Sequence, residues 1–149
     1  MILELLERLD RKRIIMDRQC NEPLLTRYYL FLKERKHFPF NVFLHKFHKG
    51  DPGDVHDHPW PYFTLILKGG YYEYTPNIKY GKMISETKHW RGPGHFRFCS
   101  ATSYHRIELK PGVTPWTLFM PGPQTREWGF LVKDKWIHND KYLEANKQH

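Results

Sequence analysis

Residues 50–70 read Gly-Asp-Pro-Gly-Asp-Val-His-Asp-His-Pro-Trp-Pro-Tyr-Phe-Thr-Leu-Ile-Leu-Lys-Gly-Gly. His56 and His58 stand one residue apart in this stretch. Successive side chains of an extended segment point to opposite faces, so the two imidazoles share one face and Asp57 takes the other. The apolar run 63–67 then predicts a strand that a Gly-Gly turn closes. The pair is able to bind one metal ion, provided that a third ligand lies nearby.

His105 supplies that third candidate. It lies in the second β-type stretch, residues 94–109, whose end alternates His105, Ile107 and Leu109 with Arg106 and Glu108. Because His105 shares its face with apolar residues, we expect its ring to point into a barrel rather than toward solvent. His105 is therefore the candidate that would join His56 and His58 at a metal site.

The two stretches resemble the two motifs of the cupin superfamily. The first motif is a glycine, a His-x-His pair, a glutamate and a glycine; the second is a glycine, Pro-x-Gly, a histidine and an asparagine. The spacing fits throughout. The residue types agree at Gly50, Gly69, Gly94 and all three histidines, whereas Tyr62, Ser100, Thr102 and Leu109 replace the glutamate, proline, inner glycine and asparagine.

A wider resemblance links the chain to a group of small bacterial and phage cupins. It rests on His-Asp-His-Pro-Trp at 56–60, Leu-Lys-Gly-Gly-Tyr-Tyr-Glu at 67–73, Tyr-His-Arg-Ile-Glu-Leu at 104–109, and the tryptophan-rich stretch 116–130. This resemblance spans roughly residues 24–132. It implies a cupin barrel with a metal site, and it names no substrate.

The resemblance implies a three-histidine site in which Tyr62 stands where a carboxylate would be. Glu73 is the one carboxylate close after the motif that could replace the missing glutamate. Its place beyond the Gly-Gly turn favours instead either an outer-face residue or a hydrogen-bonding role in the pocket, and whether Glu73 or Tyr62 completes the metal site stays open. Neutral imidazoles suit several divalent transition metals. Fe(II) is favoured because cupin thiol dioxygenases hold it with three histidines; Zn, Ni, Mn and Cu are alternatives. His45 and His48 precede the motif on a predicted strand, facing opposite sides, and we do not expect them to be ligands.

The fold class follows from the turns between the strands. The sequence predicts β-type stretches at residues 24–32, 40–48, 63–67, 71–74, 83–90, 94–109, 116–120 and 127–132. It also predicts an amphipathic helix at 2–9, a basic surface cluster at 11–13 and a polar loop at 75–82. Short strands without alternating helices are typical of an all-β sandwich or barrel. With the histidine spacing, we predict an all-β double-stranded β-helix, the cupin jelly-roll barrel. One domain covers 1–149, with its core at 24–132 and a polar tail at 133–149 that Trp136 and Tyr142 anchor.

Composition narrows the class of protein further. The 149 residues are 40% hydrophobic and 16% aromatic, which excludes a disordered chain. No apolar run approaches the roughly 20 residues of a membrane span, and the first residues lack the basic start and cleavage site of a signal peptide. Cys20 and Cys99 form no CxxC pattern, so neither a disulfide framework nor a zinc knuckle is expected. We expect a cytoplasmic protein.

Three functional hypotheses follow. The first is an Fe(II)-dependent oxygenase acting on a small anionic substrate, with Tyr62 and Arg126 as catalytic residues, Arg97 and Lys68 as further anion-binding candidates, and Trp60 or Trp128 as an aromatic wall. The second is a non-redox cupin, either an isomerase or a metal-dependent binder of a sugar or nucleotide. The third, suggested by the net charge of +8, is a nucleic-acid-associated protein; the spread of the basic residues disfavours it. Small cupins commonly pair, so a homodimer is expected.

Overall fold

The structure, a computed structural model, describes residues 1–51 and 53–146. Pro52 and the last part of the predicted tail, 147–149, lie outside the described residues. The elements, in chain order, are α1 (Ile2–Arg8), β1 (Lys12–Asp17), β2 (Glu22–Tyr29), β3 (Phe43–Phe47), β4 (Tyr62–Lys68), β5 (Tyr71–Lys79), β6 (Lys82–Arg91), β7 (Phe96–Cys99), β8 (Arg106–Glu108), β9 (Trp116–Pro121), β10 (Gly129–Val132), β11 (Lys135–His138) and α2 (Asn139–Ala145).

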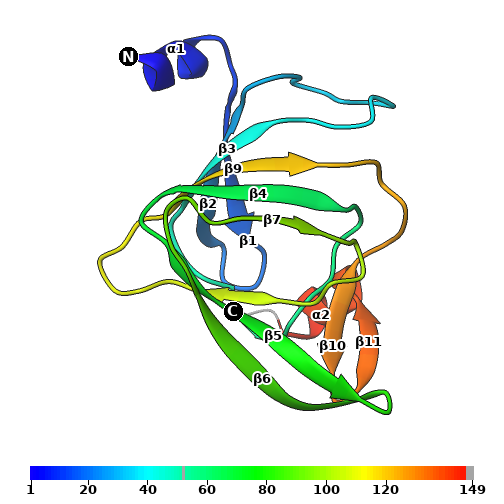
Figure 1. Cartoon of the computed structure of the whole chain (residues 1–149). Coiled ribbons are helices and arrows are strands. Elements are labelled where there is room, and N and C mark those ends of the chain that lie inside the picture. The colour runs from blue at the N-terminus through cyan, green and yellow to red at the C-terminus, as the bar shows by residue number, and fades with distance from the viewer. Residues whose placement is uncertain (52, 147–149) are drawn as a thin grey trace.

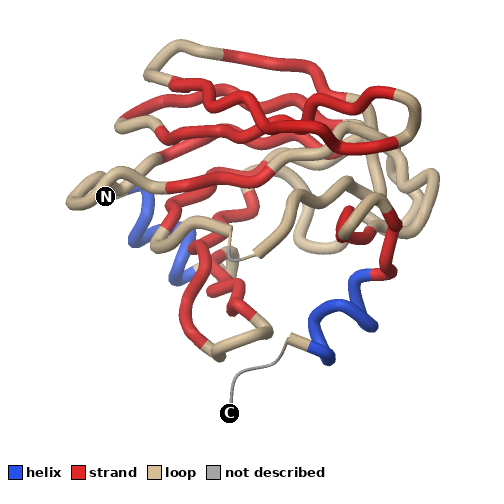
Figure 2. The backbone as a smooth tube through the Cα atoms, turned by 90° about the horizontal axis from the view of Figure 1, so that it is seen from below, coloured by secondary structure: helices blue, strands red, loops and turns tan. Residues whose placement is uncertain are grey.

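The strands form three antiparallel sheets. A six-stranded sheet has the order β1-β2-β3-β9-β4-β7, a three-stranded sheet has the order β6-β5-β8, and β10 pairs with β11. Figure 1 shows the six-stranded sheet above the long β5–β6 hairpin and the β10–β11 hairpin, so the sheets face each other across an interior. Both helices lie at the margins of the strands (Figure 2). The predicted all-β jelly roll with a short N-terminal helix is confirmed.

Alternate residues of β3, of β4 and of the first part of β5 are buried in the interior. On β4, Tyr62, Thr64 and Ile66 are buried at 6%, 9% and 1% exposure, while the residues between them face outward. Ile66 packs with Tyr71 and Ile107 in the apolar core. The interior outside this cluster contains both apolar and polar buried side chains.

The first strand differs from expectation. Lys12–Asp17 forms β1, although the sequence predicts only a basic surface cluster there. The strand lies at the edge of the sheet, and only Asp17 of its six residues is buried. Its apolar residues, Ile14, Ile15 and Met16, are consecutive, so no alternating apolar pattern marks it. Charged residues on such an edge discourage pairing with another chain.

The predicted polar loop at residues 75–82 is wrong. Strand β5 continues to Lys79, and the turn to β6 falls at Tyr80 and Gly81, both with positive φ, as a two-residue hairpin requires. Pro76 is tolerated within the strand because β8 pairs only with residues 72–74, which leaves one side of β5 unpaired beyond that point.

The C-terminal tail is more ordered than predicted, since it contributes β11 and α2. Both residues expected to anchor the tail, Trp136 and Tyr142, contact the rest of the protein. The Tyr142 ring stacks on Phe130 at 3.8 Å, and Trp136 donates to a buried carboxylate described below. No helix among the described residues is both long and apolar enough to cross a membrane.

Candidate metal centre

The three histidines are placed by backbone pairing between the two motif stretches. The His56 amide donates to the His105 carbonyl at 2.9 Å and the His105 amide donates to the His56 carbonyl at 3.0 Å, while the His58 amide donates to the Ala101 carbonyl at 3.0 Å. Gly50 permits this close approach, because a Cβ there would lie 2.6 Å from the Ile107 carbonyl oxygen. The register of these loops, rather than any one strand, therefore brings the imidazoles together.

The three imidazoles form one compact cluster. One ring nitrogen from each of His56, His58 and His105 lies within 4.8 Å of the other two. Their ring centroids are 4.8 to 5.2 Å apart. His58 and His105 are each 8% exposed. The sequence expectation that these three residues converge inside the barrel agrees with this geometry.

The cluster has the protonation state that a metal requires. Burial lowers the pKa of His56 and of His105 to about 4, and lowers that of His58 well below its ordinary value. The rings are therefore neutral at pH 7 and offer lone pairs. Nδ1 of His58 is buried and has no hydrogen-bond partner in the part of the chain that the structure describes. A buried acceptor without a donor is costly, and a bound cation would satisfy it.

Glu73 fixes the orientation of His105. Its Oε2 lies 2.7 Å from Nδ1 of His105, and its Oε1 accepts from Arg97 and, at 3.1 Å, from Nε of Arg91. The carboxylate is 3% exposed and shares its charge with two guanidinium groups. Nδ1 of His105 therefore carries the proton and Nε2 is left for a metal, an arrangement common in metal sites. Of the two roles that its sequence position favours, Glu73 has that of a hydrogen-bonding residue in the pocket and is not an outer-face residue.

Asp57 faces away from the cluster, as the alternation predicts. Its Oδ1 accepts from the Gly129 amide at 2.7 Å, and its Oδ2 accepts from Nε1 of Trp136 at 3.0 Å and from Arg126. The side chain is 1% exposed. It ties β10 and β11 to the segment that carries His56 and His58, so the two ligand candidates are held from behind.

The cluster opens onto an internal cavity of about 310 Å³. Its aromatic wall begins at the histidine cluster. The ring centroid of Tyr62 lies 4.5 Å from that of His58, and the Trp60 ring stacks on His58 with a centroid distance of 5.8 Å. Trp128 and Phe119 complete the wall. Burial raises the pKa of Tyr62 well above its ordinary value, so its phenol is protonated at neutral pH. The volume is at the small end of the ~300–1,000 Å³ that ligand sites span.

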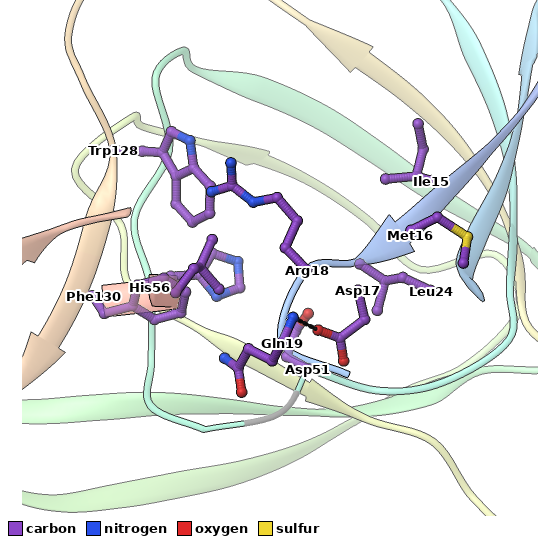
Figure 3. A pocket seen from close by; sticks show the side chains of 11 residues that line it. Ile15, Met16, Asp17, Arg18, Gln19, Leu24, Asp51, His56, Trp128 and Phe130 are labelled. Carbon is purple, nitrogen blue, oxygen red and sulfur yellow. Dashed lines mark hydrogen bonds between the residues drawn. The ribbon is translucent and has the colours of Figure 1, made fainter. Parts of the chain in front are cut away.

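A second pocket, of about 260 Å³, adjoins this cavity at His56. Figure 3 shows Trp128, His56 and Phe130 on one side of it and Ile15, Met16 and Leu24 of the first two strands on the other. The two spaces share the side chains of Ile15, Leu24, Asp51, His56 and Trp128. His56 is therefore accessible from both, and the pocket forms an approach to the cluster.

The expected anion-binding residues lie elsewhere. Arg97 is paired with Glu73, Arg126 lies behind Asp57 and donates to it, and Lys68 is exposed at the end of β4. The cationic side chain that lines the cavity is Arg27 of β2. The sequence signal for it is weak: Arg27 shares the period-two face of Leu25 and Tyr29 in an apolar strand, which indicates an inward position.

The metal-free protein should lose stability between pH 6.5 and about 4. His56 and His105 have an ordinary pKa of 6.5 and a folded pKa of about 4, so in this window the unfolded chain binds more protons than the folded one. The free energy of unfolding therefore decreases as the pH is lowered through this window, by on the order of 3 kcal/mol for each histidine. Urea unfolding with a chelator, repeated across this range, measures the loss. The His37→Gln variant, altered in an exposed turn, serves as the control, and a constant midpoint down to pH 5 would contradict the expectation.

Comparison with known proteins supports the architecture. No family model and no curated protein sequence matches the chain. Solved structures do: the polyketide cyclase RemF from Streptomyces resistomycificus has a TM-score of 0.62 at 16% identity, covering 91% of this chain and 89% of that one. The hydroxypropylphosphonic acid epoxidase from S. wedmorenis matches with a TM-score of 0.54 at 11% sequence identity. The match covers 75% of this chain but only 56% of the epoxidase chain. A cupin-2 domain protein from Rhodospirillum rubrum matches with a TM-score of 0.55 at 14% sequence identity, and the match covers 81% of this chain and 72% of that one. At these identities the likeness concerns the fold, and the chain has the cupin fold.

Proposed function

We propose that the chain is a metal-dependent oxygenase in which His56, His58 and His105 hold Fe(II) and a small anionic substrate reacts in the adjoining cavity. The observation that carries the proposal is the convergence of three neutral imidazoles, two of them buried and that of His56 half-buried, on the wall of an internal cavity. Among the described residues no carboxylate joins the cluster. Three protein ligands leave coordination positions free for other molecules, as in catalytic rather than structural sites.

The choice of metal rests on the chemistry of the ligands. Imidazole nitrogens suit Fe, Zn, Ni and Cu, and one structure of the epoxidase HppE contains Fe(II). Iron held here would supply the capacity to react with O2. The second candidate function is a non-redox cupin, which the likeness to a polyketide cyclase favours.

The residues of the chain would bind and orient the substrate and exclude water. Tyr62 keeps its proton and lies against His58, where its phenol can donate a hydrogen bond to a substrate oxygen. The aromatic wall excludes water, which strengthens electrostatic interactions inside the cavity. Arg126 acts through Asp57, as a positioning residue for the segment that carries His56 and His58.

Substrate-dependent O2 consumption tests the proposal. The protein is loaded with Fe(II) without air, and an O2 electrode follows uptake over a panel of thiols, diketones and phenols. We expect uptake with at least one class, and none when Zn(II) replaces iron. Iron binding without uptake on any substrate, together with turnover by the zinc form, would favour the non-redox function instead.

A further inference from the structure

A row of polar side chains crosses the inner face of the six-stranded sheet. Arg27 of β2 is directly opposite His45 of β3, and His45 is directly opposite Thr117 of β9. All three line the cavity. Because paired residues on neighbouring strands share a face, the row is one continuous surface. We call these three residues the polar row.

Arg27 is a cation inside the barrel that lacks an acidic partner. Arg97 and Arg126 pair with Glu73 and Asp57, yet no carboxylate of the described residues pairs with Arg27. Its Nε donates to Nε2 of His45 at 3.1 Å, and its guanidinium carbon lies 4.3 Å from the centre of the Phe43 ring. Burial lowers its pKa, but a guanidinium keeps its charge at neutral pH. An uncompensated charge in such a place is costly unless an anion joins it.

The rest of the polar row adds donors. Because Nε2 of His45 accepts from Arg27, Nδ1 carries the proton of the neutral ring. The ring is held between Phe43 and Phe119, with centroids 5.6 and 5.1 Å away. Thr117 is 1% exposed, and its Oγ1 has no hydrogen-bond partner in the described chain. Leaving such a buried hydroxyl unpaired destabilises the fold. The row is thus rich in donors, and an oxyanion would satisfy them.

The polar row lies within a small molecule's reach of the histidine cluster. The rings of Tyr62 and Phe119 stand between His58 and His45 along the cavity wall. Consecutive centroids in this series are 4.5, 5.1 and 5.1 Å apart. A ligand lying along this wall would touch aromatic faces between two polar ends.

We propose that Arg27, with His45 and Thr117, binds the oxyanion end of the substrate, a carboxylate or phosphoryl group, and so directs its other end toward the histidine cluster. The guanidinium fork matches either group. The cavity of about 310 Å³ restricts the substrate to a small molecule with one anionic end and an aromatic or apolar body. The second half of this assignment rests on the proposed metal function, whereas oxyanion binding at the polar row does not.

Calorimetric titration tests the polar row with defined probes. Benzoate, phenyl phosphate and the uncharged benzamide are titrated into metal-free protein and into protein loaded with Co(II). We expect benzoate or phenyl phosphate to bind at least about tenfold more tightly than benzamide in both forms, because only the two anions form a charge-assisted pair with the guanidinium. The anion that binds more tightly distinguishes carboxylate from phosphoryl recognition.

Variants assign the effect to Arg27. Arg27→Met should weaken anion binding at least about tenfold while Co(II) binding stays unchanged, and Arg27→Lys, which keeps the charge but not the fork, should recover part of it. Lys68→Met removes one exposed positive charge and should change nothing. Equal affinity for benzoate, phenyl phosphate and benzamide, or full anion affinity in Arg27→Met, would overturn the assignment. Absence of Co(II) binding in the unaltered protein would instead count against the metal function alone.

Discussion

Replacing His105 with alanine should abolish tight metal binding while the fold is retained. Its imidazole is one of the three nitrogens that converge within 4.8 Å, so the substitution leaves only the His-x-His pair. Loss of a residue that merely supports a ligand typically costs 10–100-fold in affinity, and loss of a ligand itself should exceed about 100-fold. Metal content after Co(II) loading and desalting measures the effect, together with the visible absorption of bound Co(II).

The backbone geometry makes this substitution interpretable. His105 is paired with His56 through main-chain amide and carbonyl groups, which alanine keeps. His48→Ala is the matched control, because His48 is exposed and its ring contacts Thr26 at 2.6 Å rather than the cluster. A His105→Ala protein that keeps its full metal content would show that the three-histidine assignment is mistaken.

The parts of the site that the sequence predicts are those that follow from strand periodicity. His56 and His58 share a face because they are two residues apart, and the same argument turns Asp57 away. His105 is predicted to face inward because Ile107 and Leu109 share its side. Each of these expectations depends only on residues close by in the sequence. The convergence of the two stretches, in contrast, is predicted from the resemblance of their spacing to the cupin motifs.

The parts that escape prediction depend on register between distant strands. Arg27 lies in the cavity beside His45 because β2 pairs with β3 at that one alignment. A shift by one residue would turn its side chain to the other face. The same holds for Asp57, whose partners Arg126, Gly129 and Trp136 follow some 70 residues later. Charge alone does not distinguish Arg27 from the other basic residues, since Lys68 is equally basic but its side chain is exposed.

Replacing Glu73 with glutamine should weaken both metal binding and the fold. The amide is nearly isosteric but cannot serve all its neighbours: if its oxygen faces His105, its NH2 group faces the donors of Arg91 and Arg97. If its NH2 group faces His105 instead, Nδ1 must accept, and the proton moves to the Nε2 that a metal would use. We expect a 10–100-fold loss of Co(II) affinity, as for other partners of metal-bound histidines.

The loss of stability has a separate origin. Glu73 is the buried carboxylate between two partly buried guanidinium groups, with side chains 4%, 17% and 28% exposed for Glu73, Arg91 and Arg97. Removing one member of such a group costs about 3–5 kcal/mol, because the remaining charges stay desolvated. Urea unfolding of the metal-free protein measures this term independently of metal affinity.

Glu86→Gln provides the matched control for both measurements. Glu86 accepts from Nη2 of Arg106 at 2.8 Å on the same three-stranded sheet, but the pair is about one quarter exposed and does not contact His105. Its loss should cost less than about 1 kcal/mol and leave Co(II) affinity unchanged. Glu73→Asp tests the negative charge separately from the length of the side chain. The shorter carboxylate keeps the charge near the arginines but does not keep the hydrogen bond to Nδ1 of His105. Relative to Glu73→Gln, it should therefore restore more of the stability than of the Co(II) affinity. If Glu73→Gln binds Co(II) as tightly as the unaltered protein, Glu73 only neutralises the arginines, and the orientation of His105 must come from its backbone alone.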